Sequence, residues 1–233
     1  MKIKIYGDGA NIKDMIKARD EGIVKGFTTN PTLMAKAGIT DYEKFAKDVL
    51  KEITELPISF EVFSDDFDEM ERQALLINSW GDNVNIKIPI TNTKGESSVP
   101  LISKLLKQGV KLNVTAIFTL GQLEELQQAI YFTDSIILSV FAGRIADAGA
   151  DPMPMLKKAR NKLFGSYDNV EILWASTREV FNIIQAEKCG CDIITVTYDI
   201  IDKLKNIGKE LNQFSLETVQ MFYNDAKKSG FSL

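Results

Sequence analysis

Short runs of β-branched and apolar residues alternate with longer helical patterns along the whole chain. Runs typical of strands fall at 2–8, 26–30, 58–63, 84–90, 111–117, 135–141, 170–176 and 193–198. Helical patterns fall near 11–20, 41–54, 67–79, 98–108, 120–130, 152–164, 178–188, 200–210 and 215–229. The spacing of roughly 25–30 residues per strand and helix fits βαβ units, which span about 30 residues.

Eight such units predict an α/β protein with a single (β/α)8 TIM barrel and an extra C-terminal helix. The chain of 233 residues is close to the usual length of that fold. A doubly wound sheet is the alternative, but Gly7 and Gly9 lack the third glycine of the dinucleotide-binding fingerprint. The prediction is a catalytic barrel over 1–210 and a helical tail over 211–233.

The tail carries an apolar stripe at helical spacing. Ser215 is the predicted N-cap of its helix. The stripe consists of Leu216, Val219, Phe222, Tyr223 and Ala226. This face packs either on its own barrel or on a neighbouring subunit, and the pattern alone leaves both open.

Side chains in a strand alternate between two faces, so the apolar positions that face the helices assign the others to the barrel interior. Leu112, Val114 and Ala116, for example, are predicted to face the helices. The inward set is polar apart from Phe141 and consists of Lys4, Tyr6, Asp8, Ser59, Glu61, Asn85, Lys87, Asn113, Thr115, Ser139 and Phe141. Charged residues are rarely buried unless paired, and barrel interiors are normally apolar. We therefore expect a functional site there, with a structural ion pair of Lys87 with Glu61 or Asp8 as the alternative.

The chain contains no histidine, which limits its chemistry. Nucleophile–histidine pairs and imidazole zinc ligands are excluded, so acid–base work falls to carboxylates, lysine, hydroxyls or water. A neutral lysine can attack a ketone and form an imine. Desolvation favours the neutral amine, whereas an ionised carboxylate nearby favours the ammonium. Lys87 is the candidate nucleophile, and Asp8 and Glu61 are candidate acid–base groups.

Charge and hydropathy favour a soluble cytoplasmic protein. The formal net charge of −4 is unfavourable for binding nucleic acid. No apolar run approaches the ~20 residues of a membrane span, and the first residues lack the apolar region of a signal peptide. Cys189 and Cys191 are interpreted as reduced structural residues.

Two arginines are predicted at the carboxyl ends of neighbouring strands. Arg144 follows the strand near 135–141, and Ser176 and Arg178 lie where the strand near 170–176 meets the next helix. A helix N-terminus, a hydroxyl and arginines together make a phosphate-binding site. The alternative is that Ser176 or Thr177 is only an N-cap and that the arginines form surface ion pairs.

Five short motifs follow one another in a familiar order and spacing. They are Thr28–Thr32 (TTNPT), Asn85–Pro89 (NIKIP), Leu112–Thr115 (LNVT), Ser139–Arg144 (SVFAGR) and Ala175–Arg178 (ASTR). Together they resemble the transaldolase family, specifically its short-chain branch, which also contains the fructose-6-phosphate aldolases. The resemblance covers nearly the whole chain.

The resemblance implies a Schiff-base mechanism without cofactor or metal. Lys87 matches the imine-forming lysine and Asp8 the acid–base group for C–C cleavage, while Glu61 and Thr115 match the pair that holds a catalytic water. The remaining matches are substrate-binding: Asn30, Asn113 and Ser139 for the dihydroxyacetone hydroxyls, and Arg144, Ser176 and Arg178 for the sugar phosphate.

The implied reaction transfers a dihydroxyacetone unit from sedoheptulose 7-phosphate or fructose 6-phosphate to glyceraldehyde 3-phosphate or erythrose 4-phosphate, in the non-oxidative pentose phosphate pathway. Phe141, in the substrate site, and Glu61 favour transaldolase, because aldolase-type relatives carry Tyr and Gln there. An aldolase that releases free dihydroxyacetone and a non-catalytic sugar-phosphate binder are the alternatives. The resemblance also implies a homo-oligomer, a pentameric ring or decamer in which the tail is exchanged.

Overall fold

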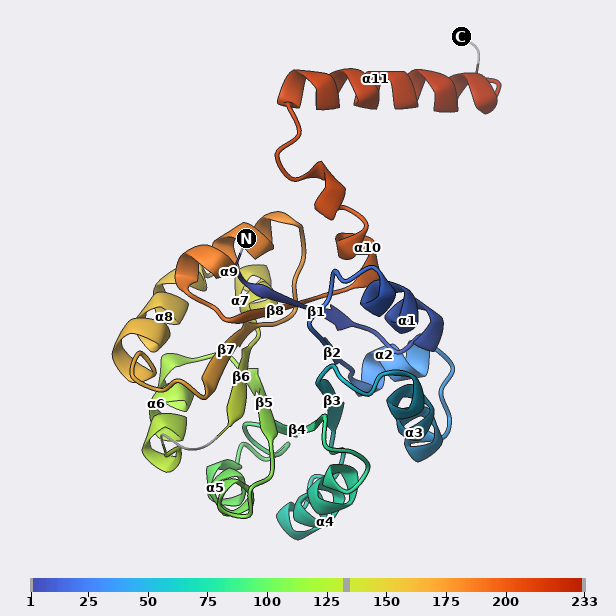
Figure 1. Ribbon diagram of the computed structural model, residues 1–233. Coiled ribbons are helices and arrows are strands. Elements are labelled where there is room, and N and C mark those ends of the chain that lie inside the picture. The colour runs from blue at the N-terminus through green and yellow to red at the C-terminus, as the bar shows by residue number, and fades with distance from the viewer. Residues whose placement is uncertain (1, 132–134, 232–233) are drawn as a thin grey trace. The chain divides into compact units, whose positions relative to one another are not determined.

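The computed structural model describes residues 2–131 and 135–231. Within them, eight parallel strands pair in sequence order, and β8 pairs with β1 to close a barrel with helices outside it (Figure 1). The predicted (β/α)8 fold is therefore confirmed. The strands are β1 (Lys4–Asp8), β2 (Gly26–Thr28), β3 (Ile58–Glu61), β4 (Val84–Pro89), β5 (Leu112–Ile117), β6 (Ile136–Val140), β7 (Val170–Trp174) and β8 (Ile193–Val196).

The helices of the barrel agree with the sequence pattern except in three places. They are α1 (Ile12–Asp20), α2 (Pro31–Lys36), α3 (Tyr42–Glu52), α4 (Phe67–Asn78), α5 (Val99–Lys107), α6 (Leu120–Ala129), α7 (Ala142–Asp147), α8 (Met153–Lys158) with the π-helical turn η1 (Ala159–Leu163), α9 (Phe181–Cys189) and α10 (Tyr198–Ile201). The short helices α2 and α7 were not predicted. The prediction of one continuous helix near 200–210 is wrong, because only α10 and the 3-10 turn η2 (Leu204–Asn206) form there.

Several helices begin at a side chain that accepts a hydrogen bond from the first turn. Asn30 Oδ1 accepts from the amide of Leu33 at 3.0 Å, and Asp66 Oδ1 accepts from Glu69 at 3.0 Å. Such caps satisfy amide groups that have no partner within the helix. Asn30 also positions the loop after β2, at the carboxyl end of the barrel.

The interior of the barrel is apolar only in its middle. Tyr6, Ile137, Leu173, Ala175 and Ile193 pack together and are almost fully buried. We call these five residues the mid-barrel cluster. They separate a polar layer at the carboxyl ends of the strands from a second polar layer at the amino ends, and the two layers line different cavities.

The chain divides into two compact units, Met1–Ile201 and Asp202–Leu233. The predicted boundary at 210/211 falls inside the second unit, where α11 (Leu211–Lys228) begins. Ser215 is not the N-cap of this helix: the Glu210 carboxylate accepts from the amides of Asn212 at 2.9 Å and Gln213 at 2.7 Å. No helix in the part of the chain that is described has the length and apolar character to cross a membrane.

Candidate active site

A cavity of about 470 Å³ opens at the carboxyl ends of the strands, and a smaller one of about 30 Å³ lies beside it. Both cavities are lined by Asp8, Asn30, Phe141 and Ser176. Glu61, Arg144 and Arg178 line the larger cavity, and Lys87, Thr115 and Ser139 line the smaller one. Of the predicted site residues, Asn113 alone is not among the residues that line either cavity.

Lys87 projects inward from β4, and its side chain is almost fully buried. Its Nζ lies 3.0 Å from Glu61 Oε2 and donates to the carbonyl oxygen of Thr29 at 3.0 Å. The pairing follows from the sheet, because Glu61 stands opposite Lys87 in the register of β3 and β4. The predicted contact between the lysine and a carboxylate is thus present, and its two side chains line cavities rather than a closed core.

Asp8 ends β1 and accepts a hydrogen bond from Thr28 Oγ1 at 2.8 Å. The Thr28 hydroxyl lies 2.5 Å from that of Thr195, so Thr195 donates to Thr28 when Thr28 donates to Asp8. Burial raises the pKa of the Asp8 carboxyl, and Glu61 adds to the rise, while Lys87 and Thr28 oppose it. The environment therefore favours a protonated Asp8 at higher pH than in water.

A β-bulge reshapes the end of β5. The pairing register with β6 shifts between Val114 and Ile117, and Ala116 adopts a positive φ of 59°. Ala116 consequently lines the larger cavity, so the prediction that it faces the helices is wrong. Bulges commonly re-aim side chains beside functional sites. Thr115 Oγ1, next to the bulge, is buried and has no hydrogen-bond partner among the described residues.

Asn113 lies below the cavities in a buried chain of polar groups. Ser139 Oγ donates to Asn113 Oδ1 at 2.6 Å, and Asn113 Nδ2 donates to Ser59 Oγ at 3.0 Å. The chain crosses from β6 through β5 to β3. In this structure Asn113 orients Ser139, which does line the smaller cavity.

The two arginines reach the larger cavity from neighbouring elements. Arg144 in α7 stacks over the ring of Phe141, with its guanidinium carbon 5.3 Å from the ring centre. Arg178 binds the carboxylate of Asp147 with two nitrogens, and its Nε lies 3.0 Å from Oδ2. That ion pair holds the pKa of Asp147 below its usual range.

The segment after β7 does not form the predicted helix N-terminus at Ser176 and Thr177. Helix α9 begins later, at Phe181, and the Asn182 Oδ1 accepts from the amides of Arg178 at 2.9 Å and Glu179 at 3.2 Å. Ser176 instead adopts a positive φ of 63°, which is uncommon outside glycine. The strained turn places Ser176 in both cavities.

Gly143 fits between α7 and this turn. A Cβ atom at Gly143 would lie 1.6 Å from the carbonyl oxygen of Ser176. The Gly143 amide also donates to the carbonyl of Ala175 at 3.3 Å. Because Gly143 has no side chain, its backbone can lie directly against the Ser176 carbonyl. This close approach allows Arg144 and Ser176 to line the same cavity.

Sequence reasoning missed Thr28, Thr195 and Ala116. The parity rule could have found the two threonines, since Thr195 stands opposite the inward-facing Tyr6 and Thr28 opposite Asp8. Ala116 could not have been found this way, because a bulge interrupts the alternation on which the rule depends.

These features define the class: a (β/α)8 barrel whose buried lysine and carboxylates lie at the carboxyl end, where enzymes of this fold carry their active sites. A family model described as "Transaldolase/Fructose-6-phosphate aldolase" matches residues 5–233. The chain belongs to this family, as its motifs indicated.

Relatives of known sequence carry a consistent name. A probable transaldolase of Thermoanaerobacter sp. is 34% identical over 235 residues, which cover 99% of this chain and 100% of the relative. A probable transaldolase of Dehalococcoides mccartyi is 35% identical over 200 residues, which cover 85% and 88% of the two chains. The protein is thus an enzyme of the aldolase and transaldolase family.

Solved structures support the fold at low identity. Dihydrodipicolinate synthase from Rhodopseudomonas palustris has a TM-score of 0.52 at 14% identity, over 96% of this chain and 79% of that chain. A structure described as native KDPGal has a TM-score of 0.54 at 11% identity, over 84% and 82%. At such identities the similarity concerns the barrel alone.

Proposed function

We propose that the protein is a transaldolase that transfers a dihydroxyacetone unit from a ketose phosphate to an aldose phosphate through an imine on Lys87. The observation that carries the proposal is the burial of Lys87 beside Glu61, in the polar layer that also contains Asp8. A buried lysine among acid–base groups has the components that imine chemistry requires.

The proposed cycle begins at the ketose carbonyl. The neutral amine of Lys87 attacks this carbon, and loss of water gives a protonated imine. Glu61 lies 3.0 Å from Nζ, close enough to accept the proton that the ammonium must lose first. The unpartnered hydroxyl of Thr115 supports its role, with Glu61, in holding the water that is lost and later added.

Asp8 is the proposed base for C–C cleavage. It takes the proton of the hydroxyl on the carbon that becomes the aldehyde, at one end of the breaking bond, while the bonding electrons move toward the imine nitrogen and the aldehyde leaves. The resulting enamine then attacks the acceptor aldehyde, and Asp8 returns its proton. A carboxyl group whose pKa is raised by burial suits a residue that alternately holds and releases a proton.

Arg144, Ser176 and Arg178 are the proposed phosphate-binding residues, and Asn30, Ser139 and Phe141 surround the carbon chain. Arg178 would exchange the Asp147 carboxylate for the substrate phosphate, since both bind a guanidinium in the same bidentate way. Asn113 acts through Ser139 in this proposal.

The donors proposed are sedoheptulose 7-phosphate and fructose 6-phosphate, and the setting is the non-oxidative pentose phosphate pathway in the cytoplasm. An aldolase that releases dihydroxyacetone is the second candidate. Glu61 and Phe141 in the cavity and the names of the relatives favour the transferase. Turnover of fructose 6-phosphate that requires erythrose 4-phosphate supports it, whereas turnover without an acceptor supports the aldolase.

Borohydride trapping tests the imine directly. Reduction in the presence of fructose 6-phosphate, without an acceptor, is expected to leave a reduced dihydroxyacetone unit on the peptide that contains Lys87, because the aldehyde phosphate departs after C–C cleavage. Lys87→Met should abolish the adduct, while the exposed control Lys107→Met should retain it. An adduct that persists in Lys87→Met, or none in the native protein, would contradict the mechanism, and the latter result would favour a non-catalytic sugar-phosphate binder.

A further inference from the structure

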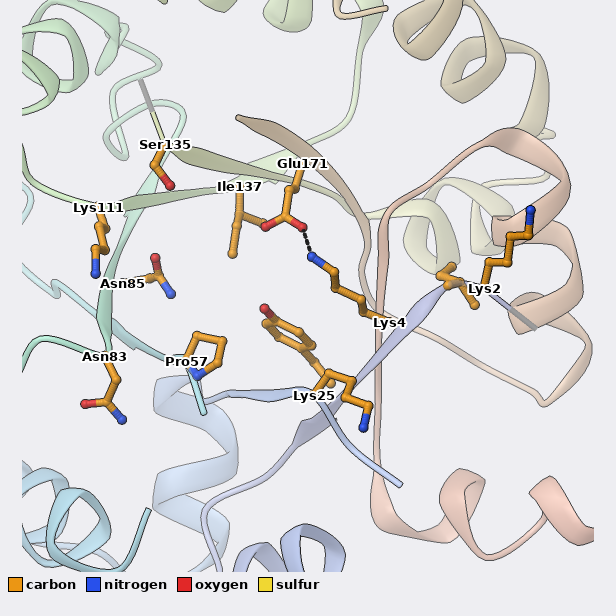
Figure 2. A pocket seen from close by; sticks show the side chains of 12 residues that line it. Lys2, Lys4, Lys25, Pro57, Asn83, Asn85, Lys111, Ser135, Ile137 and Glu171 are labelled. Carbon is orange, nitrogen blue, oxygen red and sulfur yellow. Dashed lines mark hydrogen bonds and ion pairs between the residues drawn. The ribbon is translucent and has the colours of Figure 1, made fainter. Parts of the chain in front are cut away.

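A second and larger cavity, of about 670 Å³, lies at the opposite, amino end of the barrel (Figure 2). Four lysines and one carboxylate line it: Lys2, Lys4, Lys25, Lys111 and Glu171. Its size is within the range of small-molecule sites. The amino end of such barrels ordinarily contributes to stability rather than to catalysis, so a strongly positive cavity there calls for an explanation.

Two of the lysines bind backbone carbonyls that follow helix C-termini, which explains only part of the positive charge in the cavity. Lys111 Nζ donates to the carbonyl of Asp82 at 2.7 Å, and Lys25 Nζ lies 3.5 Å from the carbonyl of Gly22. An ammonium has three donors, so each lysine retains others for a ligand. Lys4 Nζ binds Glu171 Oε1 at 2.6 Å, which neutralises the carboxylate in the cavity.

Two polar side chains in the cavity wall, Asn85 and Tyr6, make no hydrogen bond within the described part of the chain. The two residues are 8% and 3% exposed as a whole, and both line the cavity. Figure 2 shows the Asn85 amide between Lys111 and the pair of Lys4 with Glu171. The Asn85 amide and the Tyr6 hydroxyl are therefore both available to donate hydrogen bonds to a ligand in the cavity.

We propose that this cavity is a second binding site, for a small multivalent anion that carries phosphate groups. Lys4 and Lys111 contact the anion from opposite sides, and the Asn85 Nδ2 and the Tyr6 hydroxyl donate to its oxygens from the floor. Phosphate fits this arrangement because it offers several acceptor oxygens and more than one negative charge to converging donors.

The site is distinct from the candidate active site. Tyr6 and Ile137 of the mid-barrel cluster line the amino-end cavity, whereas Ala175 of the same cluster lines the small cavity at the carboxyl end. The two sites are thus separated by packed side chains and can be tested independently.

Calorimetric titration of the full-length protein with inorganic pyrophosphate, at low ionic strength, tests the proposal. Lys4→Gln and Lys111→Gln should each weaken binding about tenfold or more, the usual effect of losing a charge-assisted hydrogen bond. Asn85→Asp, which keeps the side-chain shape but adds a negative charge, should abolish binding at the amino-end site. Lys107→Gln, which removes an equal charge outside the cavity, should change the affinity less than about twofold.

Arg178→Gln separates this site from the candidate active site, because it removes an arginine only from the latter. Pyrophosphate affinity at the amino-end site should survive that change. The proposal is overturned if Lys4→Gln and Lys111→Gln behave like Lys107→Gln, if pyrophosphate does not bind, or if binding is lost in Arg178→Gln.

Discussion

At the scale of single residues, Asp8 shows how burial and hydrogen bonding oppose each other. Burial disfavours its charged form, whereas the Thr28 hydroxyl and the positive charge of Lys87 favour it, and burial prevails. A folded protein that keeps such a carboxylate ionised at neutral pH is less stable for it, which enzymes accept at positions that handle protons.

Asp8→Asn is therefore expected to make the protein more stable at neutral pH while lowering kcat about a hundredfold or more, because the proton acceptor is lost. The folded-state pKa of Asp8 is raised, so its destabilising effect is complete above that pKa and disappears below the unfolded value. The difference in Tm between the variant and the native protein should shrink as pH falls toward 3.8, the ordinary value of Asp.

Asp147→Asn is the control, because the pKa of Asp147 is shifted in the opposite direction to that of Asp8. The pKa of Asp147 is lowered by Arg178, so its stabilising effect is present above the unfolded pKa and is lost as pH falls through the folded one. The variant should be no more stable than the native protein at neutral pH. A pH-independent Tm difference in Asp8→Asn would contradict the account of Asp8.

At the scale of elements, the site depends on how α7 meets the end of β7. Gly143→Ala would place a methyl group against the Ser176 carbonyl, so one of the two segments must move. A displacement of about 1 Å in a positioned group can lower kcat/KM by about a hundredfold, and we expect a loss of that order with phosphorylated substrates.

Gly121→Ala is the matched control for that substitution. Its Cβ would lie 4.0 Å from the nearest side-chain atom, in helix α6. Alanine there should stabilise the helix by up to about 1 kcal/mol and leave the kinetics unchanged. Equal kinetics for the two alanine variants, measured by coupled assay, would show that the close contact at Gly143 does not position the site.

The elements also show what sequence reasoning can predict. The eight strands could be predicted because buried parallel strands are short, apolar runs between helices. Helices α2 and α7 could not, since six residues are too few for a periodic pattern. The bulge at Ala116 and the positive φ of Ser176 arise from contacts between strands and loops that lie far apart in the sequence.

At the scale of the whole molecule, the second unit (Asp202–Leu233) exposes apolar side chains along helix α11. Val219, Phe222 and Tyr223 of α11 are 60%, 61% and 65% exposed. Exposed apolar patches commonly mark interfaces. We propose that this face is buried in a homo-oligomer, the pentameric ring or decamer with an exchanged tail that the family resemblance implies.

Removal of residues 211–233 is expected to reduce the mass of the assembly measured by light scattering. The double variant Val219→Asp and Phe222→Asp should do the same, while Gln220→Asp should leave the mass unchanged. An unaltered assembly after the truncation would exclude the tail as the oligomer contact.

The mid-barrel cluster bears on the order in which the donor aldehyde leaves the site and the acceptor binds. Because these packed side chains lie between the two polar layers, the candidate active site has its entrance at the carboxyl ends of the strands. For the proposed transfer, the aldehyde released from the donor must depart through that entrance before the acceptor arrives. The barrel can thus hold one carbonyl partner at a time, and reciprocal initial-rate plots at several acceptor concentrations should run parallel.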